Sequence, residues 1–446
     1  MKHILVFGAG LVARPLVHYL LHQANCRVTV ASRTLSKARS LVGDHPQGKA
    51  VAFDITKDGA GLDDLVAGAD LAVSLLPYIY HVQVAKRCIA HKKHLVTTSY
   101  VSDEMRALDK EAQEAGVTLL NEIGLDPGID HMSAKRIINM VHKAGGEIKS
   151  FRSYCGGLPA PEANDNPLGY KFSWSPRGVV LAGRNDARYK EYGHIVEVPN
   201  ARLFATHYLT WVEGLGDFEA YPNRNSLPYI ELYGIQETDT MYRGTLRNVG
   251  WCDVMQKLNE LGYFSLEERT DLSGKTFRQV MAELVGKKDT PDLKSDLAAH
   301  LNLAPNCGVM MTLEWLGLLD DAPVPDKGTT LLDVLAERML VKMSYREQER
   351  DMVILVHEFI AVYPPSPEGK RKERITSTLI AFGTPGGDSA MARTVGLPAA
   401  IGARMILEGK ITLTGVHIPV LPEIYEPVLE ELERLGITCK ELSQPL

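Results

Sequence analysis

Residues 4–13 read ILVFGAGLVA, and this stretch decides the fold. The four apolar residues predict a short buried strand, and GAGLVA predicts a tight turn that leads into a helix. In such a turn the first glycine permits the turn itself, and the second lets the backbone approach a pyrophosphate at the helix N-terminus. We therefore expect a dinucleotide site here, with a glycine turn that binds no ligand as the alternative. The candidate residues are Gly8, Ala9, Gly10, Leu11 and Val12.

Further strand patterns follow within the first 125 residues, separated by stretches of helix length. They lie at 27–31, 50–53, 71–76, 94–97 and 117–120. Apolar strands that alternate with helices are typical of a parallel sheet with crossover helices, the doubly wound α/β arrangement. Residues 1–125 are therefore predicted to form a Rossmann-type dinucleotide-binding domain.

The end of the second strand indicates which dinucleotide binds. Proteins that take the unphosphorylated cofactor usually place Asp or Glu there, about 20 residues after the glycines. This chain has no acid at that point, and Ser32, Arg33 and Thr34 offer a guanidinium and two hydroxyls to a 2′-phosphate. A solvated surface arginine is the alternative. Asp54 and Ile55 are candidates for the adenine pocket, although Asp54 could equally cap a helix.

After residue 125 the regular alternation of strand and helix patterns ends. A helix is predicted over 131–144, and residues 150–233 predict strands joined by long loops. Further helices are predicted at 252–261, 276–285, 293–303 and 331–342. Two strands are expected at 345–359 and 372–382, on either side of a proline-rich loop at 363–369. The last long apolar helix is predicted at 389–407.

The composition is that of a globular protein, with 45% hydrophobic and 23% charged residues among 446. Lys and Arg total 49 and Asp and Glu total 55, and this net charge of −6 argues against nucleic-acid binding. An acidic substrate must therefore be bound by local cations. The cysteines are scattered without a zinc-site spacing, which indicates no metal and a reducing, cytoplasmic compartment. No apolar run approaches the roughly 20 residues of a membrane span, so no membrane partner is expected.

Polar residues cluster after the later strands. The clusters are TTSY at 97–100, EIGLDPGIDH at 122–131 and YCGGLP at 154–159. Ligands of α/β sheets bind outside the carboxyl ends of the strands, where the first two clusters fall. Together they predict the substrate side of the site, and the third cluster can fold over them. In that third cluster Gly156 and Gly157 follow Cys155, and we expect their missing side chains to let the backbone approach a ligand.

Several longer stretches carry a resemblance to a known family. They are GAGLVARP at 8–15, GLDPGIDH at 124–131, SYCGGLPAPEANDNPLGYKFSWSPRG at 153–178, AYPNR at 220–224 and RGTLR at 243–247. In these stretches the chain resembles saccharopine dehydrogenase of the L-glutamate-forming kind, also called saccharopine reductase. The resemblance runs nearly end to end and includes GTPGGDSAMA at 383–392; the helical stretch 253–345 is its least distinctive part.

The resemblance implies an NADP(H)-dependent enzyme of lysine metabolism that interconverts saccharopine with L-glutamate and 2-aminoadipate 6-semialdehyde, and a homodimer. Its reaction is imine formation and hydride transfer. The implied fold has three parts. They are a variant Rossmann domain at 1–125, to which about 389–446 returns, an α/β substrate and dimerisation domain at 126–250 and about 345–388, and a small helical domain at 251–344.

The resemblance also implies site residues. Those at the family's cofactor positions are Ala9, Gly10, Leu11, Val12, Ser32, Arg33, Thr34, Asp54, Ile55, Leu76, Thr98, Ser99, Leu125, Asp126, Pro127 and Trp174. Those at its substrate positions are Ser99, Tyr100, Asp126, Arg224, Thr245, Leu246 and Arg247. Ser99 and Asp126 stand in both sets, because cofactor and substrate meet there.

The chemistry of saccharopine agrees with these positions. Its three carboxylates require separate guanidinium groups from an acidic protein, for which Arg224 and Arg247 are candidates. Asp126 can hold the substrate ammonium, and the candidate catalytic residues are Asp126, Cys155 and Tyr100, as proton shuttles. The alternatives are a structural salt bridge for each arginine, a helix cap for Asp126 and core packing for Cys155 and Tyr100.

Two other functions stay open at this point. A related dehydrogenase that makes carboxylated polyamines such as carboxynorspermidine would reduce the same kind of imine, with a diamine in place of glutamate. A protein that senses NADP(H) without catalysis could also use this fold. The arginine pair favours the tricarboxylate substrate over that of the polyamine-forming enzyme.

Overall fold

The computed structural model describes residues 1–287, 291–325, 329–366 and 369–446. The chain divides into two compact units. Unit 1 comprises Met1–Ile148 and Ala361–Leu446, and unit 2 comprises Lys149–Ile360. In sequence, unit 2 is therefore an insertion within unit 1.

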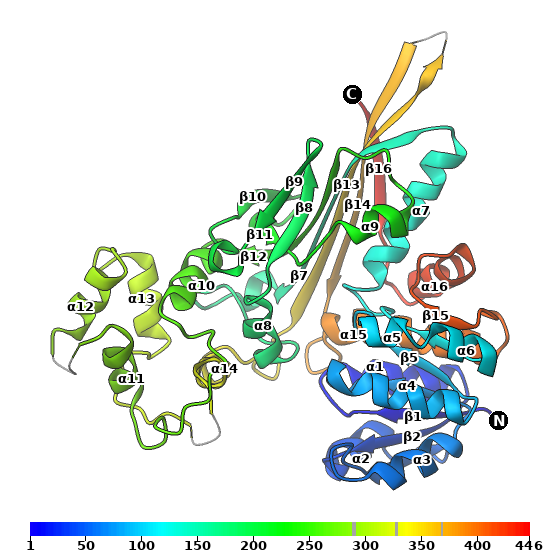
Figure 1. Cartoon of the computed structure of the whole chain (residues 1–446), viewed down its shortest axis with the longest axis horizontal. Helices are drawn as coiled ribbons and strands as arrows, with labels where there is room; N and C mark the ends of the chain where they lie inside the picture. Colours follow the sequence, from blue (N-terminus) through cyan, green and yellow to red (C-terminus); the bar gives the residue numbers. More distant parts are fainter. Residues whose placement is uncertain (288–290, 326–328, 367–368) are drawn as a thin grey trace. The chain divides into compact units, whose positions relative to one another are not determined.

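Unit 1 contains a seven-stranded parallel sheet, drawn mainly in blue in Figure 1. Its strands are β1 (His3–Phe7), β2 (Arg27–Ser32), β3 (Gly48–Ala52), β4 (Leu71–Ser74), β5 (His94–Thr97), β6 (Thr118–Leu120) and β15 (Gly415–His417). Their order is β15–β6–β5–β4–β1–β2–β3, so the strand order reverses between β1 and β4. This confirms the doubly wound arrangement, whose ligand crevice lies at such a reversal. The predicted strand at 71–76 is shorter, because β4 ends at Ser74.

Helices connect these strands and complete unit 1. They are α1 (Ala13–His18), η1 (Tyr19–Gln23), α2 (Leu35–Val42), α3 (Gly59–Ala67), η2 (Tyr78–Tyr80), α4 (His81–Ala90), α5 (Asp103–Arg106), α6 (Asp109–Ala115), α7 (Ile129–Lys143), α15 (Ala390–Leu407) and α16 (Pro422–Arg434). Helix α16 lies beside α7 and α15, although its sequence is far from that of α7 (Figure 1). The antiparallel pair β14 (Gly369–Phe382) and β16 (Lys440–Pro445) also belongs to this unit.

Helix α15 packs against α1, which follows the glycine turn. Ser389 begins α15 by accepting a hydrogen bond from the Ala392 amide at 3.0 Å. A Cβ at Gly396 would lie 2.7 Å from the Val12 carbonyl oxygen, so only glycine allows the helices to come this close. Helix α15 thus packs closely against the residues that begin α1.

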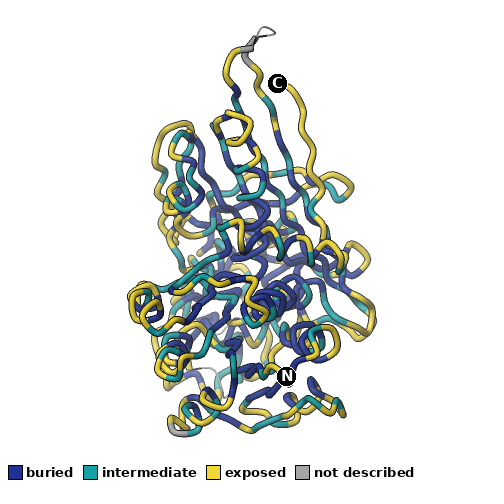
Figure 2. The backbone as a smooth tube through the Cα atoms, turned by 90° about the vertical axis from the view of Figure 1, so that its right-hand side faces the viewer, coloured by how far each residue is buried: buried dark blue, intermediate teal, exposed yellow. Residues whose placement is uncertain are grey.

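The strands of unit 1 carry its core. Residues 4–7 of β1 are at most 1% exposed, and Figure 2 shows long buried stretches of backbone in the interior with exposed residues at the periphery. Burial of a parallel strand on both faces explains why its sequence is continuously apolar rather than alternating.

Unit 2 is built on a mixed sheet and a set of helices. Its strands are β7 (Glu147–Pro159), β8 (Ala187–Glu191), β9 (His194–Val198), β10 (Tyr208–Val212), β11 (Gly216–Pro222), β12 (Thr240–Asn248) and β13 (Asp351–Ser366). Its helices are η3 (Pro161–Ala163), α8 (Pro176–Ala182), η4 (Asn200–Arg202), α9 (Pro228–Tyr233), α10 (Trp251–Glu260), α11 (Phe277–Leu284), α12 (Leu293–His300), α13 (Gly308–Trp315) and α14 (Leu331–Lys342). The strand order runs β10–β11–β12–β7–β13, which places β10 at an edge.

The predicted loop at 363–369 is partly wrong. Strand β13 continues through Pro364 and Pro365 to Ser366, and β14 begins at Gly369. Proline suits the extended backbone near the end of a strand, where a missing N–H costs little. Residues 367–368 lie outside the described part. The first strand of the pair begins at Asp351 rather than at 345.

The described ranges contain neither a membrane-spanning helix nor a cluster of metal-binding side chains. Every helix within them is too short or too polar to cross a bilayer. No three His, Cys, Asp or Glu side chains within them are arranged to hold a metal ion.

Candidate active site

The glycine turn of unit 1 has the geometry that a bound pyrophosphate requires. Gly8 has φ +104°, and a Cβ there would lie 3.0 Å from the Leu75 carbonyl oxygen, so glycine is required. A Cβ at Gly10 would meet nothing within 4 Å, and Leu11 is 63% exposed. The turn therefore leaves open space over its backbone at the N-terminus of α1, and the residues present fit a dinucleotide.

The end of β2 carries the residues predicted for the 2′-phosphate. Arg33 and Thr34 are exposed, and the Ser32 hydroxyl accepts a hydrogen bond from the Thr34 amide at 3.3 Å. Asp54 accepts hydrogen bonds from the Thr56 amide at 3.1 Å and hydroxyl at 2.8 Å, which lower its pKa. The helix-cap alternative for Asp54 is wrong, because Asp58 caps α3.

The carboxyl ends of β4 and β5 meet around a histidine that the sequence did not single out. His81 contacts Ser74 through one ring nitrogen, and Thr97 and Ser99 through the other. Leu76 packs against the core of this unit, and a Cβ at Gly124 would lie 3.1 Å from the Thr98 Cβ. The two polar clusters at 97–100 and 122–131 are therefore neighbours in the fold.

The second cluster is organised by a buried contact between a carboxylate and a histidine. Glu122, with φ +55°, contacts His131 Nε2 at 2.8 Å through one carboxylate oxygen and accepts the Val101 amide at 2.9 Å through the other. The peptide bond between Asp126 and Pro127 is cis. These contacts fix the turn that carries Leu125, Asp126 and Pro127.

The structure brings two of the candidate proton shuttles together. The Tyr100 hydroxyl donates to Asp126 Oδ1 at 2.7 Å, and both side chains are half-buried. Helix α7 begins after Gly128, whose amide is bound by Asp130 Oδ1 at 2.6 Å. Asp126 is therefore not the cap of α7, and its carboxylate is held by a phenol instead.

In unit 2, Arg247 is a buried cation held between aromatic rings. It is 5% exposed, and its guanidinium carbon lies 4.9 Å from the Tyr170 ring centroid and 5.3 Å from the Trp251 ring. Its Nη1 donates to the Leu246 carbonyl at 2.8 Å, whereas its buried Nε has no hydrogen-bond partner within the described residues. Its electrostatic neighbours are the phenols of Tyr170 and Tyr221 and thiols.

The nearest carboxylate on the facing strand is used elsewhere. Glu219 lies opposite Arg247 in the β11–β12 register. Its two oxygens accept the amides of Gly250 at 2.8 Å and Cys252 at 2.7 Å, at the start of α10. No ion pair neutralises Arg247 among the residues that the structure describes. A buried charge of this kind is costly unless an anion binds to it.

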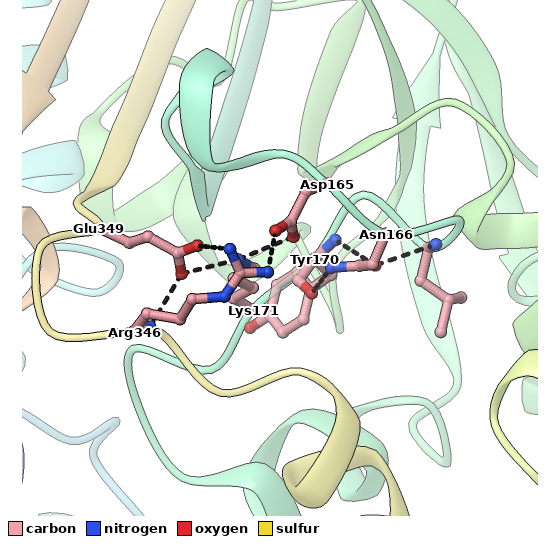
Figure 3. A network of polar contacts seen from close by, with 7 residues as sticks. Asp165, Asn166, Tyr170, Lys171, Arg346 and Glu349 are labelled. Atoms are coloured by element: carbon pink, nitrogen blue, oxygen red, sulfur yellow. Dashed lines mark hydrogen bonds and ion pairs between the residues drawn. The ribbon is translucent and has the colours of Figure 1, made fainter.

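The aromatic ring under Arg247 is held by a polar network. Lys171 is 3% exposed and lies 2.8 Å from Asp165 and 2.7 Å from Glu349 (Figure 3). Asn166 Nδ2 donates to the Tyr170 carbonyl at 2.9 Å, and Trp174 Nε1 donates to the Tyr170 hydroxyl at 3.1 Å. The sequence predicted Trp174 but gave no signal for Tyr170 or Lys171.

Cys155 and Thr245 are partners on the neighbouring strands β7 and β12, and Leu246 follows Thr245. Cys155 is buried, at 7% exposure. The expectation that Gly156 opens the backbone to a ligand is wrong, because a Cβ there would lie 2.8 Å from the Leu246 carbonyl oxygen and therefore face β12. Arg224 is exposed, with φ +56°, in the loop after β11.

Two sequence models of one family cover nearly the whole chain. Residues 4–120 match the saccharopine dehydrogenase NADP binding domain, and residues 124–437 match the saccharopine dehydrogenase C-terminal domain. The chain belongs to the saccharopine dehydrogenase family. This confirms the resemblance drawn from the sequence motifs, and the NADP cofactor with it.

Curated relatives match this chain over nearly its full length. The chain is 42% identical to saccharopine dehydrogenase [NADP(+), L-glutamate-forming] of Pyricularia oryzae, over 99% of this chain and 98% of that one. It is 38% identical to alpha-aminoadipic semialdehyde synthase of Bos taurus, over 98% of this chain and 47% of that one.

Solved structures agree with the family's fold. Apo saccharopine dehydrogenase (L-Glu forming) of Saccharomyces cerevisiae has a TM-score of 0.88 and 41% identity, covering 100% of both chains. Homospermidine synthase of Legionella pneumophila has a TM-score of 0.55 at 11% identity, covering 99% of this chain and 91% of that one, which shows a shared fold alone.

Proposed function

We propose that this protein is an NADP(H)-dependent oxidoreductase that interconverts saccharopine with L-glutamate and 2-aminoadipate 6-semialdehyde in lysine metabolism. Its likeness to the L-glutamate-forming enzymes over the full length supports this reaction. The observation that carries the substrate class is Arg247, a buried guanidinium without a carboxylate partner among the described residues. A substrate carboxylate would supply the missing negative charge.

The nicotinamide of NADP(H) supplies or accepts the hydride, and the chain's own groups do the rest. The turn at Gly8–Val12 would bind the pyrophosphate, and Arg33 the 2′-phosphate. Asp126 would hold the substrate ammonium and accept its proton, with Tyr100 passing protons to and from that carboxylate. Arg224 and Arg247 would orient the substrate through its carboxylates.

The remaining predicted site residues keep their proposed roles. Ser99 would contact both cofactor and substrate. Cys155 would assist proton movement, with a smaller contribution to the rate than that of Asp126. The other cofactor positions are Ser32, Thr34, Asp54, Ile55, Leu76, Thr98, Leu125, Pro127 and Trp174, and the other substrate positions are Thr245 and Leu246.

The deciding experiment follows NADPH oxidation by the purified protein. We expect turnover with 2-aminoadipate 6-semialdehyde only when L-glutamate is present. Turnover with 1,3-diaminopropane and aspartate semialdehyde in place of these substrates would instead assign a carboxynorspermidine-type reaction. Tight NADPH binding without turnover on either pair would assign a sensor.

We further propose a cytoplasmic homodimer with three structural parts, 1–125 with 389–446, 126–250 with 345–388, and 251–344. All six cysteines are described and none is in a disulfide, which suits a reducing compartment. The edge strand β10 presents Leu209 at 59% and Trp211 at 64% exposure, which suits pairing with a second copy. Sedimentation at micromolar concentration tests the dimer, and a monomer there contradicts it.

A further inference from the structure

His81 is a buried histidine for which the proposed reaction has no use so far. It is the first residue of α4, and it is 4% exposed. Its Nδ1 lies 2.9 Å from the Ser74 hydroxyl, and its Nε2 lies 2.8 Å from the Ser99 hydroxyl and 3.1 Å from that of Thr97. The ring therefore joins hydroxyls at the carboxyl ends of two neighbouring strands, β4 and β5.

The imidazole is neutral at working pH. Burial lowers its pKa to about 4, and the polar groups in contact with it are hydroxyls rather than carboxylates. Its place at the first turn of a helix also disfavours a cation. A neutral imidazole has one donor and one acceptor nitrogen, so it must donate on one side and accept on the other. The hydroxyl orientations on its two sides are therefore linked.

Exposure distinguishes the three hydroxyl residues. Ser74 is 0% and Thr97 is 1% exposed, whereas Ser99 is half-buried. Only Ser99 can therefore present its hydroxyl to a ligand. It lies after β5, one strand from β4 and two from β1, on the ligand side of the sheet near its reversal of strand order.

We propose that His81 is a positioning residue that fixes the direction of the Ser99 hydroxyl toward bound ligand. A hydroxyl group can donate or accept a hydrogen bond. The contact with the imidazole Nε2 commits the Ser99 hydroxyl to one of these roles on that side, and Ser74 holds the ring through Nδ1. A hydroxyl fixed before binding spares the ordering cost on binding. This inference rests on the proposed function, because that function assigns Ser99 to cofactor and substrate.

Two conservative variants separate the two faces of the ring. In His81→Asn the amide lies near the position of Nδ1, so the contact with Ser74 survives and that with Ser99 is lost. In His81→Gln the amide reaches the position of Nε2, so a contact with Ser99 is restored. We expect His81→Asn to lower kcat/KM about tenfold or more, and His81→Gln to stay within about threefold of wild type.

The matched control is His91, which follows the C-terminal end of the same helix. It is half-exposed and its Nε2 lies 2.9 Å from Asp63 Oδ1, far from the strand ends that carry Ser99. His91→Asn and His91→Gln should leave kcat/KM unchanged.

A double-mutant cycle with Ser99→Ala tests whether His81 acts through Ser99. We expect His81→Asn to have no further effect on kcat/KM, or on the NADPH dissociation constant, once Ser99 is alanine. Additive effects of the two substitutions, or equal losses of kcat/KM in His81→Asn and His81→Gln, would overturn the proposal. His81 would then have only a structural role, in connecting β4 and β5. If His81→Asn does not fold, Ser74→Ala takes its place and must show the same dependence on Ser99.

The NADPH measurement keeps the two proposals separate. If the wild-type protein shows no turnover, the proposed reaction is contradicted. The double-mutant cycle measured on the NADPH dissociation constant would still test the role of His81. Melting temperatures of all variants show whether a loss is structural.

Discussion

Arg247 carries a buried positive charge that opposes folding and favours binding. Its guanidinium stacks on two rings but meets no carboxylate among the described residues. Replacing buried charges by apolar side chains of similar volume is often neutral or stabilising by about 1–4 kcal/mol. We therefore expect Arg247→Met to keep or raise the free energy of unfolding while it raises KM for glutamate or saccharopine at least tenfold. Denaturant unfolding and steady-state kinetics measure both quantities, and a clear loss of stability with unchanged KM would contradict a substrate role.

Arg33 is the residue that we propose distinguishes NADPH from NADH. It is exposed after β2, where no acid is available to bind a ribose hydroxyl. Arg33→Ala should weaken NADPH binding by about 1.5–3 kcal/mol, the range for a hydrogen bond to a charged group. NADH binding should barely change, because NADH has no 2′-phosphate. Fluorescence titration with both cofactors is the measurement, and equal losses would show that Arg33 does not contact that phosphate.

His81 makes stability depend on pH. Its pKa is lowered by burial from 6.5 to about 4, so the unfolded chain binds the proton first as pH falls. Its contribution is complete above pH 6.5 and is lost between pH 6.5 and 4, by about 3 kcal/mol in all. In His81→Gln this titration is absent, so the free energy of unfolding should fall less between pH 7 and pH 4.5. Denaturant unfolding at the two pH values checks this, and parallel losses in both proteins would contradict it.

At the scale of elements, α15 contains two glycines with different surroundings. A Cβ at Gly396 would lie 2.7 Å from the backbone oxygen of Val12, whereas one at Gly402 would lie 2.8 Å from the terminal Cδ1 atom of the Ile123 side chain. Gly396→Ala should therefore cost about 1–3 kcal/mol and weaken NADPH binding, because it displaces α1. Gly402→Ala should stay within about 1 kcal/mol, helped by the helix propensity of alanine. Thermal unfolding and NADPH titration of this pair provide the test, and equal effects would contradict it.

The sequence predicted elements better than contacts. The strand and glycine turn at 4–13 could be predicted from the sequence. Their burial and backbone conformation are set by residues that are neighbours along the chain. The stacking of Tyr170 on Arg247 could not be predicted in this way, since the two residues are remote in sequence and meet only in the folded chain. Gly156 misled for the same reason, because the strand that it faces is remote in sequence. His81 carried no signal, since its hydroxyl partners lie on two strands.

At the scale of the whole molecule, unit 1 is assembled from both ends of the chain. The glycine turn lies near the N-terminus, and the helix that packs against α1 lies at Ala390–Leu407. A ligand bound at the glycine turn should therefore slow hydrogen exchange in α15 as well as in β1 and α1. The helices α10–α14 of unit 2 offer an internal control.

Hydrogen exchange with and without NADPH tests this distribution. At a concentration of 100 times the dissociation constant, binding stabilises the protein by about 2.7 kcal/mol. We expect slower exchange at residues 8–18, at 31–34 and in α15, and unchanged exchange in α10–α14. In the Gly396→Ala variant, NADPH should slow exchange in α15 less than in the wild-type protein, because the helix no longer fits closely against α1. Slowing at 170–178 would support the cofactor contact predicted for Trp174, whereas an unchanged α15 would contradict the coupling of the two chain ends.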